Sequence, residues 1–140
     1  MREIFDKLSI RTTDYFASIG ILNEKFLSKI MNGVKGMACV GPVDKKRYKN
    51  LENIRVVKDI KELEESVFDK ILAVYSEYLN FKELVKVVDH FGMVLIQDVP
   101  INKQSVLLNL LGTKAGIFET WILRNRNQSF VDLLFKVRKY

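Results

Sequence analysis

Residues 53–100 read NIRVVKDIKELEESVFDKILAVYSEYLNFKELVKVVDHFGMVLIQDVP, and they alternate between short apolar runs and longer polar segments. The apolar runs are Ile54 to Val57, Ile71 to Tyr75 and Met93 to Ile96. Near-continuous runs of this length, separated by helical pattern, are typical of parallel strands buried on both faces. The segment therefore predicts an open α/β sheet, in which binding sites lie at the carboxyl ends of the strands.

The polar segments of this region, and the residues directly after it, have helix signals. Asn80 and Glu83 form a capping box for a helix that runs to Phe91. A second helix, Lys103 to Leu111, follows the third apolar run. Helices that alternate with parallel strands lie on the two faces of the sheet, so we expect a layered domain.

Two further strands are predicted near the end of the chain. Gly116 to Leu123 and Phe130 to Lys139 are strand-like runs, joined by the polar turn Arg124 to Gln128. Strands joined by such a short turn pair antiparallel. We therefore expect a mostly parallel sheet that ends in an antiparallel pair.

Upstream of the sheet, the first 35 residues have a helical pattern. Thr13 or Asp14 is placed to cap a helix that runs to Ile19. Asn23 is placed to cap another, Glu24 to Met31. We expect one domain over residues 1–140, with a helical N-terminal segment (1–35) and a sheet core (36–140).

The composition is that of a globular protein. The chain has 140 residues, of which 48% are hydrophobic and 29% charged, so it can bury a core without staples. Cys39 and His90 are its only cysteine and histidine, which excludes an intrachain disulfide and argues against a metal site. No run approaches the length of a membrane span, and the start lacks an apolar leader region. We expect a cytoplasmic protein that holds no metal and contacts no membrane.

Four quoted stretches carry a resemblance to a known family. NIRVVKD, FDKILAVYS and GMVLIQDVP, followed by FVDLLFKVRK, resemble the second half of the class I, Rossmann-like methyltransferases that use S-adenosylmethionine. The resemblance implies a three-layer α/β sandwich closed by an antiparallel strand pair, with S-adenosylmethionine as the possible cofactor. In that family a glycine-rich turn follows an acid-ended first strand, but no two glycines here make a GxG. The chain thus resembles a truncated or degenerate member.

The resemblance leaves two interpretations of the buried run Met37 to Val40. The residues from Pro42 to the strand at Ile54 are too few for a full helix and another strand. We favour the interpretation that the family's first strand is absent and that Met37 to Val40 is the second, which places Asp44 near the acid that binds the cofactor ribose. On the other, the first strand is kept and Gly41 is the remnant of its loop.

The resemblance also implies candidate site residues. It places cofactor contacts at Gly41, Asp44, Asp59 and Tyr75, with Asp59 where the family often contacts adenine. Asp59 is also suited to cap the turn from Ile60 to Glu65, and capping is the interpretation we favour.

Catalytic candidates follow the run from Ile71 to Tyr75. Ser76 and Glu77 lie where the family places substrate and catalytic residues, and Glu77 would act as a base if burial raised its pKa. Ordinary loop residues are the alternative that we favour, since the sequence offers no partner histidine nearby.

The net charge of +6 includes a basic cluster after the strand Met37 to Val40. The cluster consists of Lys45, Lys46, Arg47 and Lys49. Such a cluster can contact the phosphates of a nucleic acid. A solvated surface that keeps the protein soluble is the interpretation we favour.

Three functional hypotheses follow. The first, which we favour, is a methyltransferase-fold protein that has lost its cofactor loop and serves as a non-catalytic structural or regulatory subunit with a self-partner or a paralogue. The second is an active S-adenosylmethionine-dependent methyltransferase with an atypical cofactor site. The third is a small basic nucleic-acid-binding protein.

We also expect a homodimer through the N-terminal segment or the last strand, because the N-terminal segment has more apolar residues than one short helix can bury. These are Phe16, Ile19, Ile21, Leu22, Phe26 and Leu27.

Overall fold

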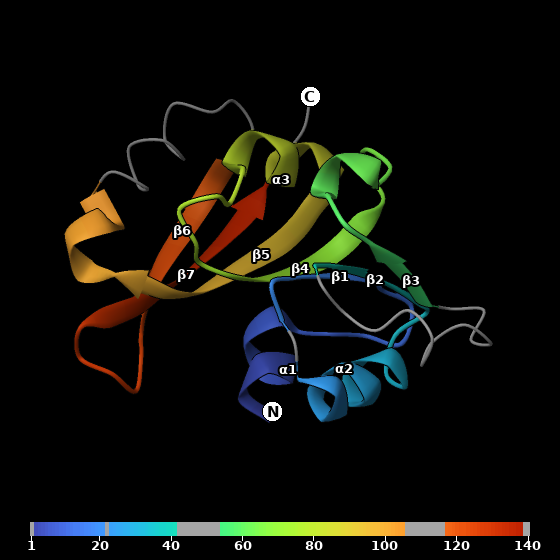
Figure 1. The fold of residues 1–140 in the computed structure, drawn as a ribbon, viewed down its shortest axis with the longest axis horizontal. Coiled ribbons are helices and arrows are strands. Elements are labelled where there is room, and N and C mark those ends of the chain that lie inside the picture. Colours follow the sequence, from blue (N-terminus) through green and yellow to red (C-terminus); the bar gives the residue numbers. More distant parts are fainter. Residues whose placement is uncertain (1, 22, 42–53, 106–116, 139–140) are drawn as a thin grey trace.

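The computed structural model describes residues 2–21, 23–41, 54–105 and 117–138 (Figure 1). Within these residues, seven strands form one sheet in the order β3-β2-β1-β4-β5-β7-β6. The elements in chain order are α1 (Arg2–Leu8), β1 (Tyr15–Ile19), α2 (Glu24–Met31), β2 (Gly36–Val40), β3 (Ile54–Val57), the 3-10 helix η2 (Ile60–Glu62), β4 (Phe68–Val74), α3 (Phe81–Val87), β5 (Val88–Pro100), the 3-10 helix η3 (Ile101–Lys103), β6 (Ile117–Arg124) and β7 (Phe130–Val137).

The sheet is mostly parallel and lies between two helical layers. Strands β1 to β5 pair in parallel, whereas β7 pairs antiparallel with both β5 and β6. Helices α1 and α2 cover one face, and α3 with η2 covers the other (Figure 1). This architecture confirms the predicted three-layer α/β fold and its antiparallel C-terminal pair.

Successive residues of the central strands alternate between two buried cores. Phe16 of β1 packs on the side of α1 and α2, in a cluster with Leu27 and Ile30. Ala17, its neighbour in β1, packs on the opposite side, in a cluster with Leu84 of α3. Because side chains of a strand point alternately to the two faces, a strand covered on both faces is mostly apolar.

The predicted helix that ended at Ile19 is wrong, because residues 15–19 form β1 in the centre of the sheet. β1 pairs in parallel with β2 on one side and with β4 on the other. These two ladders satisfy its backbone groups, and this tertiary pairing overrides the local helical pattern. The predicted helical N-terminal segment (1–35) therefore consists of helix α1, strand β1 and helix α2 in chain order. Met37 to Val40 belongs to the second strand, as favoured, but the first strand is present.

The predicted helix from Asn80 to Phe91 is too long. Asn80 Oδ1 accepts a hydrogen bond from Glu83 N at 3.2 Å, as the capping signal indicated, but α3 ends at Val87 and β5 begins at Val88. Phe91 has a φ of 61° within β5 and is 58% exposed, so it does not face the core. The pairing of β4 with β5 is irregular at this position, since Phe68 lies opposite Val88 and Lys70 lies opposite Met93.

Other predicted elements agree with the structure. Asn23 caps α2 by accepting a hydrogen bond from Phe26 N at 3.2 Å. Most of the predicted helix from Lys103 to Leu111 lies outside the described residues. Within the described part of the chain, no helix has the length and apolar character that crossing a membrane requires.

Candidate functional site

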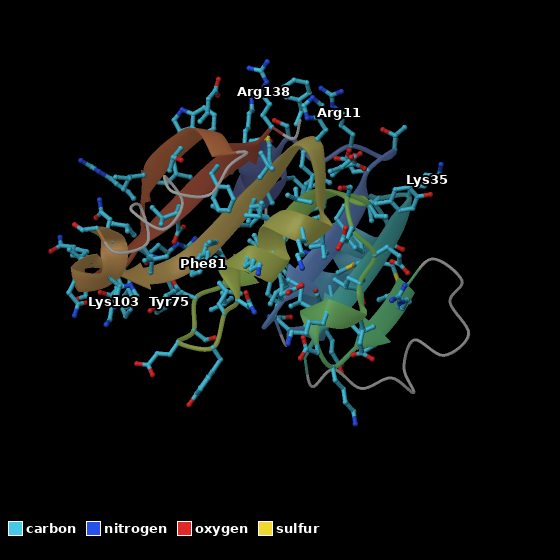
Figure 2. All side chains as sticks on the ribbon, turned by 90° about the horizontal axis from the view of Figure 1, so that it is seen from above. Arg11, Lys35, Tyr75, Phe81, Lys103 and Arg138 are labelled. Atoms are coloured by element: carbon cyan, nitrogen blue, oxygen red, sulfur yellow. The ribbon has the colours of Figure 1, made fainter. Side chains whose placement is uncertain are left out.

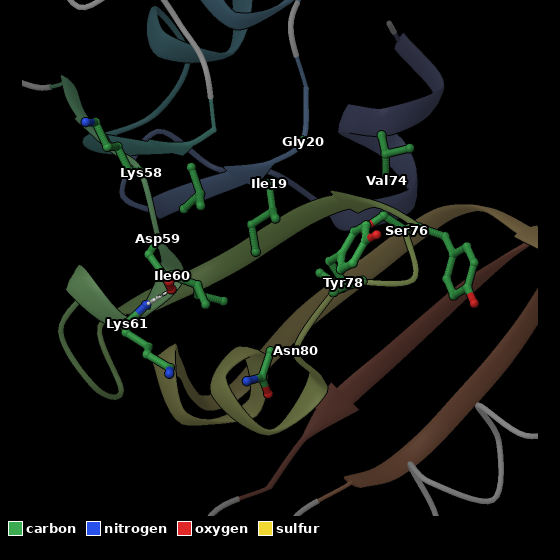
Figure 3. Close-up of a pocket in the computed structure, with 13 residues that line it drawn as sticks. Ile19, Gly20, Lys58, Asp59, Ile60, Lys61, Val74, Ser76, Tyr78 and Asn80 are labelled. Atoms are coloured by element: carbon green, nitrogen blue, oxygen red, sulfur yellow. Dashed lines mark hydrogen bonds between the residues drawn. The ribbon is translucent and has the colours of Figure 1, made fainter.

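A pocket of about 520 Å³ lies at the carboxyl ends of β1 to β4 (Figure 3). The loops that follow parallel strands meet at this edge of an open α/β sheet, where such folds bind ligands. The lining comes from the ends of β1 and β2, from η2 and the residues before it, and from the loop between β4 and α3. It consists of Ile19, Gly20, Val40, Lys58, Asp59, Ile60, Lys61, Val74, Tyr75, Ser76, Tyr78, Leu79 and Asn80.

The turn between β1 and α2 contains a single glycine. Gly20 has a φ of +76°, and its N–H donates to the carbonyl oxygen of Val40 at 3.1 Å. The positive φ requires glycine, and the bond joins the ends of β1 and β2 at the edge of the pocket. Gly20 follows the first strand, where the family resemblance places the glycine-rich turn. The sequence did not single out Gly20 as this turn, because the residues before it have a helical pattern that ends at Ile19.

Two predicted cofactor contacts lie after β2. Gly41 has a φ of +132°, and its N–H donates to the carbonyl oxygen of Val57 at 3.0 Å, which joins β2 to β3. Gly41 therefore supports the sheet edge beside the pocket but does not line it. Asp44 lies outside the described residues.

The end of β1 carries a serine where the resemblance implies an acid. Ser18 is 1% exposed, and its Oγ has no hydrogen-bond partner of normal geometry among the described residues. Burial raises the pKa of the neighbouring Cys39 thiol, and the nearby Ser18 hydroxyl has a smaller, opposing effect. Neither side chain lines the pocket, so Ser18 of β1 and Cys39 of β2 bring no charge to the site.

Asp59 lines the pocket but also caps η2. Its Oδ1 accepts a hydrogen bond from Lys61 N at 3.0 Å. In return, Glu62 Oε2 accepts from Asp59 N at 2.9 Å, which completes a capping box. The structural role that we favoured for Asp59 is confirmed, and part of its carboxylate is already used.

The predicted catalytic candidates follow β4. Tyr75 and Ser76 line the pocket, and Tyr75 N donates to the carbonyl oxygen of Gln97 at 2.9 Å, which ties this loop to β5. Glu77 is exposed and does not line the pocket. In the described part of the chain, its carboxylate has no hydrogen-bond partner that would orient it as a base. The structure thus groups Asp59, Tyr75 and Ser76 and leaves Glu77 outside.

The charge of the pocket is carried by residues that sequence reasoning did not select. Lys58 and Lys61 lie on either side of Asp59, along one wall (Figure 3). Asp59 is the single carboxylate among the described lining residues, and it takes part in the capping box. These lysines were not recognisable in the sequence, because lysines at an exposed turn are ordinary surface residues.

A second polar cavity, of about 410 Å³, lies near the turn between β6 and β7. Its lining includes Lys7, Arg124 and Arg126 together with Asp98 and Asp132. Gln97 also lines this cavity rather than the first pocket. The predicted nucleic-acid cluster of Lys45, Lys46, Arg47 and Lys49 lies outside the described residues. Among the residues described, no group of histidine, cysteine and acidic side chains is placed to hold a metal ion.

No protein family and no curated protein matches the sequence. Solved structures, in contrast, match the fold along almost all of the chain. A tRNA (m1A58) methyltransferase, TrmI from Aquifex aeolicus, superposes with a TM-score of 0.75 at 13% identity, over 99% of this chain and 68% of that one.

Two further structures give the same picture. An S-adenosylmethionine-dependent O-methyltransferase from Thermotoga maritima matches with a TM-score of 0.78 at 10% identity, over 99% of this chain and 64% of that one. The N-methyltransferase NodS from Bradyrhizobium japonicum, in complex with S-adenosylhomocysteine, matches with a TM-score of 0.69 at 15% identity, over 99% of this chain and 85% of that one. The chain therefore spans about two thirds of the length of the first two proteins. Its fold is that of the class I, S-adenosylmethionine-dependent methyltransferases.

Proposed function

We propose that this protein is a non-catalytic methyltransferase-fold subunit that acts through a second copy of itself or a related chain. The observation that carries the proposal is the chemistry of the pocket. Ser18 stands where the resemblance implies the acid of the first strand, and it is buried and does not line the pocket. The only carboxylate among the described lining residues, Asp59, is engaged in the capping box of η2.

S-adenosylmethionine has two positive groups, a sulfonium and an ammonium, and one negative group, a carboxylate, so its net charge is positive. A site that binds it well needs negative charge or acceptors near those groups. Lys58 and Lys61 give the described lining the opposite character. The charge balance therefore favours a fold retained for assembly over a working enzyme.

The edge of the sheet supports a role in assembly. Among the described residues, β6 is the last strand of the sheet, and Trp121 and Ile122 on it are 39% and 49% exposed. An unpaired edge strand with exposed apolar side chains is a surface that can pair with another chain. In contrast, Phe16 and Leu27, which motivated a dimer through the N-terminal segment, are buried in the core of one chain. β7, to which the other suggested interface belongs, is paired on both sides.

Calorimetric titration with S-adenosylmethionine and S-adenosylhomocysteine tests the loss of cofactor binding. We expect no saturable heat at millimolar ligand. Micromolar binding that is lost in Asp59→Ala or Asp44→Ala would overturn the proposal and favour an active methyltransferase.

Light scattering across micromolar protein concentrations tests self-association. We expect the parent protein to be a dimer and Trp121→Glu to be a monomer. A parent protein that is monomeric throughout would direct the search to a paralogue.

A further inference from the structure

We infer that the pocket at the carboxyl ends of β1 to β4 binds a nucleoside phosphate, with Lys58 and Lys61 as the phosphate contacts. The inference rests on the proposed loss of S-adenosylmethionine binding, and it assigns the same pocket a different ligand class. It starts from the two lysines, which the capping role of Asp59 and the fold of the sheet do not explain.

Both lysine side chains are available to a ligand. The acidic groups beside them are occupied by backbone N–H groups: Glu62 Oε2 accepts from Lys58 N at 2.9 Å, and Asp59 Oδ1 accepts from Lys61 N at 3.0 Å. Neither ammonium forms an ion pair with a carboxylate of the described residues. By comparison, Lys70 pairs with Asp14 and Lys136 with Glu119.

The arrangement suits a ligand with an apolar body and an anionic end. Lys58 and Lys61 lie on one side of the pocket with their side chains pointing in different directions, whereas Ser76 and Tyr78 lie on the other side (Figure 3). Most of the remaining lining is aliphatic, with Ile19, Val40, Ile60, Val74 and Leu79. A lysine ammonium is a point charge on a flexible stem that binds phosphate without a fixed geometry. The aliphatic lining accommodates a base and a ribose.

An exposed aromatic ring adds to the case. Tyr78 lines the pocket and is 93% exposed, although an exposed aromatic side chain loses the benefit of burial. Its phenol ring offers a flat face at the pocket mouth on which a base can stack. The full set is thus a cationic wall, an apolar lining and an aromatic ring at the mouth, and it favours a nucleotide over a free phosphate.

Titration of the full chain with ADP tests the inference. We expect saturable binding that weakens as salt rises from about 50 mM to about 300 mM, because the lysine–phosphate attraction is screened. Adenosine and inorganic phosphate alone should each bind more weakly than ADP. Lys58→Ala/Lys61→Ala should weaken ADP binding about tenfold or more, the scale of one lost charge-assisted hydrogen bond.

The matched control is Lys25→Ala/Lys29→Ala, which removes the same charge from exposed positions of α2, on the opposite face of the sheet. The control should bind ADP as the parent does, and circular dichroism should show both double variants folded. Equal loss in the two variants would overturn the inference, because it would reflect net charge alone.

The remaining outcomes separate this inference from the proposed function. Absence of ADP binding, with S-adenosylmethionine also unbound, overturns the nucleotide inference and leaves the non-catalytic role. Tight S-adenosylmethionine binding with no ADP binding overturns both. Binding of a single-stranded oligonucleotide that is tighter than ADP binding and equally dependent on Lys58 and Lys61 would place these lysines on a nucleic-acid surface, against the inference.

Discussion

Lys70 Nζ lies 3.1 Å from Asp14 Oδ2, and this ion pair joins β4 to the residue that precedes β1. The Lys70 and Asp14 side chains are only 12% and 8% exposed. Asp14 Oδ2 also accepts a hydrogen bond from Arg11 N at 2.8 Å. Asp14 was predicted to cap a helix, whereas it anchors the start of the central strand. Its hydrogen-bond partner Arg11 is labelled in Figure 2.

Replacing one partner of this pair should destabilise the protein. Lys70→Met leaves the Asp14 carboxylate largely buried without its cation, and we expect a loss of about 3 kcal/mol in the free energy of unfolding. Denaturant unfolding measures it, with Lys82→Met on the exposed side of α3 as the control. The double variant Asp14→Asn/Lys70→Met should lose less than the sum of its single variants. Single variants as stable as the control would contradict this reading.

Gly92→Ala should destabilise the junction of α3 and β5. An added Cβ would lie 2.5 Å from Val88 Cγ2 and 2.9 Å from the Asp89 carbonyl oxygen, and the carbonyl is backbone that cannot easily move. We expect a loss of about 1–3 kcal/mol, measured by thermal unfolding. The comparison is Gly20→Ala, where the added Cβ would lie 3.8 Å from the Val74 carbonyl oxygen, an ordinary van der Waals contact. The cost of that substitution therefore comes from the positive φ alone, and we expect about 1 kcal/mol. An unchanged melting temperature for Gly92→Ala would show that the junction adjusts without cost.

Asn125 should hold the turn between β6 and β7 against β5. Its Nδ2 donates to Asp98 Oδ1 at 2.7 Å and to Asp132 Oδ1 at 2.8 Å, and Asp132 is 4% exposed. Asn125→Asp removes these donors and adds a third carboxylate, so we expect a loss of about 2–3 kcal/mol at neutral pH.

The pH dependence distinguishes repulsion from lost hydrogen bonds. Acid protonates the introduced carboxyl, so the deficit of Asn125→Asp relative to the parent should shrink as the pH falls toward about 4. Asn125→Ala brings no added charge, and its deficit should change less over the same range. Equal pH profiles for the two variants would exclude charge repulsion as the cause.

Cys39 should make the protein sensitive to alkali. Burial raises the pKa of its thiol above the usual 9.0, so the folded state favours the neutral form. This contribution is present below the unfolded-state pKa and is lost as the pH rises toward the folded-state pKa. The free energy of unfolding should therefore fall more steeply above pH ~9 in the parent than in Cys39→Ala.

Thiol labelling gives an independent check of this burial. Cys39 is 0% exposed, so iodoacetamide at mildly alkaline pH should modify it only after unfolding. Labelling of the native protein at the rate of the denatured chain would show that β2 opens readily.

The apolar strands after residue 53 were predictable from local pattern. The predicted strand from Ile54 to Val57 has the same first and last residues as β3, and Met93 to Ile96 lies within β5. Met93 to Ile96 is apolar throughout because the strand is covered on both faces, which leaves a strong signal in the sequence. β3 lies at the edge of the sheet and includes the exposed Arg55, but its other three residues are β-branched and apolar. The caps at Asn23 and Asn80 were predictable for a similar reason, since each acts within one turn of its own helix.

β1 could not be predicted from local pattern, because its neighbours along the chain do not determine its conformation. Its partners are β2 and β4, and its anchor is Lys70, which is 56 residues from Asp14. The candidate site depends on the same long-range pairing: only once β1 lies between β2 and β4 do Gly20, Lys58 and Ser76 line one pocket. Local spacing thus sufficed for the strands after residue 53 and for the caps at Asn23 and Asn80. The sheet order and the grouping of the pocket residues required the tertiary structure, because hydrogen bonds between distant strands bring these residues together.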